Sequence, residues 1–282
     1  MREIVMSGWA PYAIAASPDG PVWITVLSPA GLARLSPDGA GVTLRELPAK
    51  PMLVAVGADG TVWHTSQDDR IGRDGESWFS LPAGASPYGI AADRGGGAFF
   101  SAPGIDRIGH ISASGEIEMI AAPGYPAMVT MGDDGAVWVA LNAAGKLARW
   151  DGGVVDTVDV APGRTAAAPV GIAAVGDRVW FADIAGGGVG LADGGGVVER
   201  VEFDDPGCRP HAVVAAPDGG CWVTLWGSGQ LARVSAGGAV TLFDLPGKEP
   251  HGLALVGEEV WVAMESGSVV RVTPAPRGKP SA

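Results

Sequence analysis

Short apolar runs recur along the whole chain and are separated by polar turns. The runs at residues 22–26 and 179–182 are typical, because they consist mostly of Val, Ile, Trp and Phe. Asp-Gly or Gly-Gly turns bound such runs. β-Branched and aromatic side chains suit a pleated sheet, and glycine turns join neighbouring strands. The pattern therefore predicts many short β-strands rather than amphipathic helices.

These strands belong to a repeat of about 40 residues. Each repeat has a proline, a large aromatic residue eleven or twelve positions later, and then a short Leu/Ile-x-Arg strand. The distances between successive prolines are 40, 36, 39, 43, 41 and 40 residues, which is the length of a four-stranded propeller blade. We therefore predict an all-β, seven-bladed β-propeller with these proline and aromatic pairs: Pro11/Trp23, Pro51/Trp63, Pro87/Phe99, Pro126/Trp138, Pro169/Trp180, Pro210/Trp222 and Pro250/Trp261.

The seventh repeat lacks its outer strand. The chain ends in Pro- and Gly-rich residues after position 273, whereas residues 2–6 precede Pro11 in the place that an outer strand takes in the other repeats. We expect this N-terminal strand to complete the last blade and close the ring, which removes an open sheet edge. The expected organisation is one propeller domain, 1–273, with a disordered tail, 274–282.

The composition agrees with a globular β-protein. Hydrophobic residues make up 47% of the chain and charged ones 18%, with 45 glycines and 22 prolines. The formal net charge of −12 leaves no basic surface for phosphates, so we expect neither nucleic acid nor a membrane as a partner. The N-terminus has no long apolar run, which favours a cytoplasmic monomer. Cys208 and Cys221 are expected to be reduced, structural thiols.

The residue after each repeat proline should lie at one mouth of the central channel. His211 and His251 take this position in adjacent repeats, although the protein has only four histidines. Both could merely cap strands at a polar rim, or they could take part in proton transfer if partners lie in reach. The other repeats place these residues in the same ring: Tyr12, Met52, Tyr88, Ala127 and Val170.

Two acidic residues are expected near His251. Glu249 lies two positions before it, and Glu265 lies four positions beyond the aromatic residue of the same repeat. No other repeat has an acidic residue at the position of Glu265. Carboxylates without neighbouring cysteines suit a hard cation such as Mg²⁺ or Ca²⁺, so the pattern predicts a metal site at the mouth.

Other candidate residues are better explained by structure. His64 stands where other repeats have an apolar residue, which predicts a core or rim position, and His110 replaces the third-strand arginine at the surface. The glycines at 186–190 join two strands and open no helix, so they indicate a turn rather than a phosphate loop. No Gly-x-Ser-x-Gly motif is present, and neither His211 nor His251 has a Ser or Cys at motif spacing.

Several segments resemble the streptogramin B lyase family. Pro-Tyr-Gly-Ile at 87–90, Asp-Gly-Ala-Val-Trp at 134–138 and Asp-Arg-Ile-Gly-Arg at 69–73 echo the blade motifs of that family. The resemblance covers essentially the whole chain. Four further segments, similar in order and spacing to the active-site segments of the family, are more specific: 209–212, 226–227, 249–252 and 261–265.

The resemblance implies a function and the residues that carry it. Glu249 and Glu265 would bind Mg²⁺, His251 would handle the proton, and His211 would contact the substrate. The family opens the ester-closed ring of a cyclic depsipeptide antibiotic by elimination, and Tyr12, Tyr88 and Trp226 could supply apolar walls for such a ligand. The chain departs from the family pattern at residues 222–225, at Phe99 and at residues 189–191.

Two other functions fit the same fold. A metal-assisted lactonase or esterase would add water instead of eliminating, and a non-catalytic propeller would bind a protein or sugar at its mouth. The second alternative has no need for two carboxylates beside His251. We therefore expect a Mg²⁺-dependent carbon–oxygen lyase that acts on streptogramin B-type depsipeptides.

Overall fold

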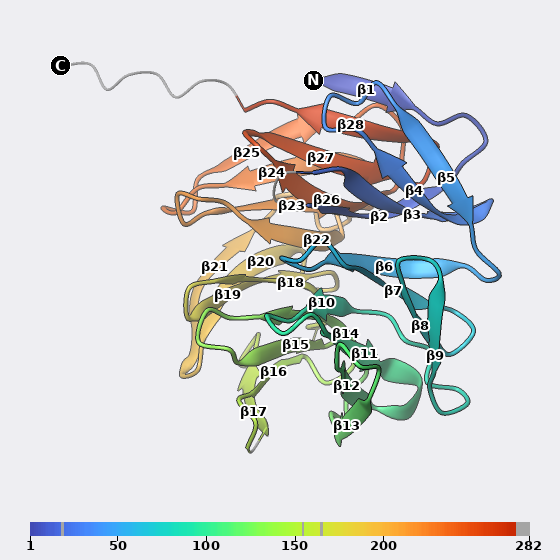
Figure 1. The fold of residues 1–282 in the computed structure, drawn as a ribbon. Helices are drawn as coiled ribbons and strands as arrows, with labels where there is room; N and C mark the ends of the chain where they lie inside the picture. The colour runs from blue at the N-terminus through green and yellow to red at the C-terminus, as the bar shows by residue number, and fades with distance from the viewer. Residues whose placement is uncertain (18–19, 154, 164–165, 275–282) are drawn as a thin grey trace.

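The computed structural model describes residues 1–17, 20–153, 155–163 and 166–274. These residues form seven antiparallel sheets of four strands each, and the sheets follow one another around a central axis as the blades of a propeller (Figure 1). The predicted fold class is confirmed.

The blades follow the repeats in chain order. Blades 1 to 3 contain these strands: β2 (Pro11–Ala16), β3 (Val22–Leu27), β4 (Ala30–Leu35) and β5 (Val42–Glu46); β6 (Pro51–Val56), β7 (Val62–Ser66), β8 (Arg70–Arg73) and β9 (Ser77–Ser80); β10 (Ile90–Ala92), β11 (Ala98–Ala102), β12 (Arg107–Ile111) and β13 (Ile117–Ala121). Blade 3 also holds a short 3-10 helix, η1 (Pro103–Ile105).

The remaining blades have the same order. Blades 4 to 6 contain β14 (Pro126–Met131), β15 (Val137–Leu141), β16 (Lys146–Trp150) and β17 (Val155–Asp159); β18 (Pro169–Val175), β19 (Arg178–Asp183), β20 (Gly188–Asp193) and β21 (Gly196–Glu202); β22 (Pro210–Ala215), β23 (Cys221–Leu225), β24 (Gln230–Val234) and β25 (Val240–Asp244). Blade 7 consists of β26 (Pro250–Val256), β27 (Glu259–Met264) and β28 (Ser268–Val272), with β1 (Arg2–Val5) as its outer strand.

The N-terminal strand closes the ring, as predicted. β1 pairs antiparallel with β28, from Arg2 opposite Arg271 to Val5 opposite Ser268. Figure 1 shows this first strand lying beside the last one. The amide of Met6 also donates to the carbonyl of Gly267 at 2.8 Å. The chain ends thus share one sheet; of the predicted tail, residues 275–282 lie outside the described residues.

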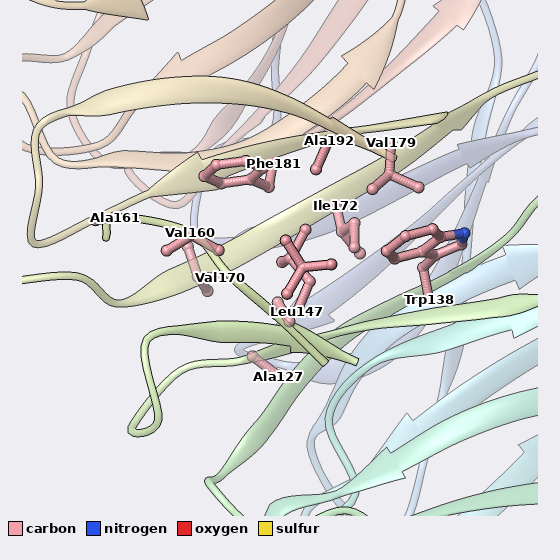
Figure 2. Close-up of a cluster of buried hydrophobic side chains, with 12 residues drawn as sticks. Ala127, Trp138, Leu147, Val160, Ala161, Val170, Ile172, Val179, Phe181 and Ala192 are labelled. Carbon is pink, nitrogen blue, oxygen red and sulfur yellow. The ribbon is translucent and has the colours of Figure 1, made fainter. Parts of the chain in front are cut away.

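The hydrophobic core lies between neighbouring blades. Figure 2 shows one such interface, where Trp138 and Leu147 of blade 4 pack with Ile172 and Phe181 of blade 5. Each of these side chains is at least 94% buried. Burial of a large apolar side chain contributes roughly 1.5–3 kcal/mol. Because every blade has such a face on both sides, the ring is stabilised by the packing of successive blades.

The third-strand arginine of the repeat packs over the aromatic residue of the second strand. The guanidinium carbon of Arg271 lies 4.6 Å from the centre of the Trp261 ring. His110 takes the arginine position in blade 3, where its ring lies 4.6 Å from that of Phe99 and its Nε2 lies 2.6 Å from Asp93. The predicted surface role of His110 is therefore a hydrogen-bonding and packing role.

Two further predictions concern the cysteines and the 186–190 glycines. Cys208 and Cys221 are both buried and unpaired, and burial raises the pKa of Cys208 to about 11. Gly186 and Gly187 lie in the turn between β19 and β20, and the later glycines belong to β20 itself. In the described residues, no helix is long and apolar enough to cross a membrane.

Candidate active site

Side chains from four blades meet at one mouth of the channel. Tyr12 of blade 1, Tyr88 of blade 3, His211 of blade 6 and His251 of blade 7 form a continuous set of contacts. The Tyr12 and Tyr88 hydroxyls are 3.1 Å apart, and the Tyr88 hydroxyl lies 3.5 Å from Nε2 of His211. The predicted gathering of these residues is therefore present in the structure.

The two histidines pack edge to face. Their ring centres are 4.9 Å apart at an interplanar angle of 88°, and the Tyr12 ring lies 4.4 Å from His251 on another side. Trp226 is more distant, with its ring centre 6.2 Å from that of His251. These contacts leave His211 7% and His251 8% exposed.

Glu265 is an acidic residue in contact with one of the two histidines. Its Oε2 lies 2.7 Å from Nε2 of His251, in a contact that is not aligned as a well-formed hydrogen bond. The amide of Glu265 donates to the carbonyl of Glu249 at 3.1 Å, so the two acidic residues are neighbours across the loop ends of blade 7. Glu249 has a left-handed backbone conformation, with φ of 58°.

Burial keeps the histidines in the neutral form. It lowers the pKa of His251 to about 4, and burial together with the neighbouring His251 lowers the pKa of His211 to about 3. Burial also raises the pKa of the Tyr12 and Tyr88 hydroxyls. Near neutral pH the mouth therefore holds two neutral imidazoles and two neutral phenols, and a neutral imidazole can accept a proton.

A β-bulge helps to place the histidine side chains. The strand register shifts directly after Pro210 and after Pro250, next to His211 and His251 respectively. Such bulges change the direction in which side chains point and are common beside active sites. The same shift follows the repeat proline in blades 1, 2, 4 and 5.

A hydroxyl between blades 6 and 7 holds the backbone of both histidines. Thr224 Oγ1 accepts from the amide of Ala212 at 3.0 Å and donates to the carbonyl of His251 at 2.8 Å. Sequence reasoning did not single out this residue. Its signal is a hydroxyl two positions after the repeat aromatic, which is also present at Thr25, Thr65 and Ser101.

The close approach of blades 7 and 1 requires a glycine after His251. A Cβ at Gly252 would lie 2.7 Å from Cα of Ala13 and 3.1 Å from the carbonyl of Tyr12. Only a residue without a side chain allows these backbones to lie so close. Gly252 thereby permits the contact between His251 and Tyr12.

Several buried polar atoms in this cluster have no well-formed hydrogen bond among the described residues. They are Nδ1 of His211, both ring nitrogens of His251 and Nε1 of Trp226. Trp226 packs under the guanidinium of Arg209, at 5.4 Å. Buried polar groups are usually paired, so such a concentration is typical of a functional site.

A pocket of about 580 Å³ extends from Tyr88 and His211 across the mouth. Its volume lies in the range of small-molecule sites. Sequence reasoning expected Tyr88 and His211 here but missed Gln67, Tyr125 and Asn142, which also line it. Gln67 and Asn142 share the repeat position of Glu265, so the register could have identified them. Tyr125 directly precedes a repeat proline, whereas most of the predicted site residues follow a repeat proline or lie four positions beyond a repeat aromatic.

A second pocket, of about 460 Å³, is lined by residues of blades 5 and 6 that include Phe203, Leu225 and Leu242. Its lining includes neither histidine nor tyrosine. His211, His251 and the tyrosines, groups that can take part in proton transfer, lie at the mouth, which we take as the candidate active site.

The metal prediction is compatible with the donor set. In the described residues, no three His, Cys, Asp or Glu side chains converge closely enough to hold a metal by themselves. Mg²⁺, however, usually keeps several waters and binds proteins through one or two carboxylates. The carboxylates of Glu249 and Glu265 have the oxygen donors that such a site needs, and Nε2 of His251 lies 2.7 Å from Oε2 of Glu265.

Comparison with known proteins identifies the family of this chain. The sequence matches the virginiamycin B lyase family over residues 1–272. It is 35% identical to virginiamycin B lyase of Nocardia farcinica, with 96% of this chain and 98% of that protein covered.

Solved structures agree with the sequence match. The crystal structure of selenomethionine-substituted virginiamycin B lyase from Staphylococcus aureus has a TM-score of 0.90 at 30% identity, covering 97% of this chain and 99% of that one. A catalytically inactive variant of the same S. aureus enzyme, crystallised with quinupristin, matches with the same values. The full-length match, the identity to the Nocardia enzyme and the shared architecture show that this chain belongs to the virginiamycin B lyase family.

Proposed function

We propose that this protein is a Mg²⁺-dependent carbon–oxygen lyase that opens the ester-closed ring of streptogramin B-type cyclic depsipeptides by elimination. Family membership supports the reaction class, and the quinupristin complex of the S. aureus enzyme supports the substrate class. The observation that carries the proposal is the neutral His251 in contact with a carboxylate, at a mouth that also holds a ligand-sized pocket.

His251 acts as the general base. The reaction begins with removal of a carbon-bound proton next to a carbonyl group, and a neutral imidazole can accept that proton. The carboxylate of Glu265, 2.7 Å from Nε2, stabilises the imidazolium that then forms. Loss of the ester carboxylate from the adjacent carbon opens the ring. No water enters the product.

His211 positions the substrate rather than taking the proton. Its Nε2 lies 3.5 Å from the Tyr88 hydroxyl, whereas Nε2 of His251 lies 2.7 Å from the carboxylate of Glu265. Tyr12 and Trp226 flank His251 and supply ring surface for the ligand. A base held between such fixed rings meets its proton in a restricted geometry, which is a large part of enzymatic rate enhancement.

Glu249 and Glu265 hold Mg²⁺ in this proposal. A Mg²⁺ ion held by these two residues would supply stabilisation of the negative charge on a substrate carbonyl oxygen. The carboxylate oxygens of the two residues have the ligand chemistry that Mg²⁺ prefers. The loop conformation of Glu249, with φ of 58°, and its backbone hydrogen bond to Glu265 bring the two residues to the same end of blade 7.

Mass spectrometry of quinupristin incubated with the protein tests this proposal. We expect a linear product with the mass of the substrate in the presence of Mg²⁺, and no product in excess EDTA. Elimination also creates a conjugated double bond, which adds ultraviolet absorbance. A product heavier by one water, carrying ¹⁸O after reaction in H₂¹⁸O, would instead support the lactonase alternative. Full activity in EDTA would contradict the metal assignment.

A further inference from the structure

Tyr125 is an exposed aromatic residue at the mouth. The chain has only three tyrosines, and the other two are Tyr12 and Tyr88. Tyr125 lines the same pocket as Tyr88, and the Tyr88 hydroxyl lies 3.1 Å from that of Tyr12. All three tyrosines of the protein therefore face one site. They differ in exposure, because Tyr125 is 52% exposed and Tyr12 only 8%.

The backbone around Tyr125 is held in an unusual conformation. Tyr125 has φ of 60°, and Asp106 has φ of 52°; both values lie in the left-handed region that non-glycine residues rarely adopt. Asp106 Oδ1 accepts from the amides of Gly124 and Tyr125 at 3.2 and 2.9 Å. The amide of Asn142 donates to the carbonyl of Tyr125 at 3.0 Å. The loop is thus fixed on both sides of the tyrosine.

Blade 3 has the same loop without an aromatic residue. Ser86 has φ of 48°, and its amide donates to Oδ1 of Asp69 at 2.7 Å. The clamp is therefore part of the blade architecture, whereas the ring that it presents is particular to blade 4. A large ring exposed from a strained, clamped backbone has no packing explanation. Aromatic side chains commonly line ligand pockets.

The pocket beside Tyr125 suits an uncharged group. Its twelve lining residues include no Asp, Glu, Lys or Arg, and burial keeps His211 neutral. In the described residues the Tyr125 hydroxyl makes no hydrogen bond, so both the ring face and the hydroxyl are available to a ligand. Tyr125 belongs to blade 4, and His251 to blade 7 across the channel.

We infer that Tyr125 is a specificity-determining residue, which contacts an uncharged planar group of the ligand, an aromatic ring or a peptide plane, on the far side of the mouth from His251. Asp106 is its positioning residue. This inference rests on the proposed function, because the ligand contacts His251 and Tyr125 at the same time. The contribution of Tyr125 is to binding, since its ring is remote from the bond that breaks.

Quinupristin binding and turnover test this role in the full-length protein. Binding is measured by calorimetry in a His251→Ala background, where turnover does not interfere. We expect Tyr125→Ala to weaken binding roughly fivefold to tenfold, the range of one aromatic contact, and Tyr125→Phe to restore most of it. In the active protein, Tyr125→Ala should raise KM by a similar factor and leave kcat nearly unchanged.

Two further variants separate a ligand contact from a structural effect. Asp106→Ala should also weaken binding, because it releases the Tyr125 loop, whereas Asp106→Asn keeps an acceptor oxygen and should bind more tightly than Asp106→Ala. Val198→Ala changes an outer-strand residue with the same 52% exposure and should bind normally. If the His251→Ala parent binds quinupristin and the added Tyr125→Ala substitution leaves that affinity unchanged, this inference is wrong while the proposed function stands. Failure of the parent to bind quinupristin would overturn the proposed function as well.

Discussion

At the scale of single residues, two histidines at equivalent repeat positions have different surroundings. His251 contacts the carboxylate of Glu265, whereas His211 faces the Tyr88 hydroxyl and the ring of His251. A carboxylate stabilises a protonated imidazole, and a phenol does so far less. The proposed roles of base for His251 and positioning group for His211 rest on this difference, which repeat register alone does not reveal.

Replacement of His251 is the direct test of these roles. We expect His251→Ala to lose roughly 10²-fold or more in kcat, the usual scale for removal of a general base. Initial rates on quinupristin at saturating Mg²⁺ measure the effect. His64→Phe serves as the control and should retain turnover, since His64 lies in the core of blade 2. If both variants remain folded and lose kcat equally, His251 is not the base.

His64 is a second buried histidine, with a role in stability. It is fully buried in β7, its ring lies 5.1 Å from Trp78, and neither ring nitrogen makes a well-formed hydrogen bond in the described structure. Burial lowers its pKa to about 4, although the charges of Asp68 and Asp74 act in the opposite direction. The folded protein therefore favours the neutral imidazole, while an unfolded chain protonates it near its ordinary pKa.

The sign of the resulting pH effect follows from linkage. Between the ordinary pKa of 6.5 and the folded value of about 4, the unfolded state binds more protons, so stability falls as pH falls through this window. Burial of the neutral His64 lowers the free energy of unfolding at pH 4 by something on the order of 3 kcal/mol relative to its value above pH 6.5. We expect His64→Phe to reduce the loss of stability between pH 6.5 and 4, as measured by urea unfolding.

The sheet offers room for that substitution. Gly72 lies opposite His64, just as Gly109 and Gly190 lie opposite Phe100 and Phe181 in blades 3 and 5. A phenylalanine in blade 2 should therefore pack over its glycine in the same way. If the free energy of unfolding of His64→Phe falls with pH as steeply as that of the unsubstituted protein, groups other than His64 cause the acid sensitivity.

At the scale of elements, hydroxyl groups join neighbouring blades at the mouth. Thr224 on β23 links the backbone beside His211 to that of His251, and Thr25 on β3 links Ala13 to Met52 in the same manner. Each hydroxyl satisfies a bulge amide in its own blade and a carbonyl in the next one. The strands therefore position the site through the backbone, not only through side-chain packing.

This arrangement predicts an unequal effect of two similar substitutions. Thr224→Val leaves a buried amide and a buried carbonyl unpaired, which should cost about 1–3 kcal/mol in stability and lower kcat on the order of tenfold. Thr25→Val should cost a similar free energy of unfolding with a smaller effect on kcat. Denaturant unfolding and steady-state rates of both variants make the comparison. A larger rate effect at Thr25 would contradict the positioning role of Thr224.

At the scale of the whole molecule, the ring depends on its N-terminal strand. Without β1 the edge of β28 is unpaired, and the buried Met6 leaves the core that it shares with Trp261. Arg271 also ties blade 7 to the carbonyl of Asp38 in blade 1, at 2.7 Å. Closure therefore supports the blade that carries Glu249, His251 and Glu265.

Removal of residues 1–6 should destabilise the entire ring. Loss of a buried methionine alone costs about 2–5 kcal/mol, so we expect Tm to fall by at least roughly 5 °C. Differential scanning calorimetry measures this change. Val5→Ser, which alters a residue 65% exposed on the same strand, should melt normally. An unchanged Tm after the deletion would mean that β1 contributes little to closure.

The sequence by itself determined the fold and the location of the site. Proline and aromatic residues recur with the length of a blade, and strand patterns depend on local sequence, so seven blades and an N-terminal closing strand could be predicted. Repeat register also placed His211 and His251 in one ring, since equivalent positions in a propeller meet at the same mouth.

The tertiary structure alone decided which side chains touch and which remain exposed. The contact of His251 with Glu265, the path from Tyr12 through Tyr88 to His211, and the exposed Tyr125 join blades far apart in the chain. Thr224 connects two blades through its hydroxyl, and the repeat pattern shows the hydroxyl but not the atoms that it contacts. Burial then lowers the histidine pKa values. Such contacts arise only when the closed ring brings separate repeats within reach of one another, because local patterning specifies strands but not the distances across a channel.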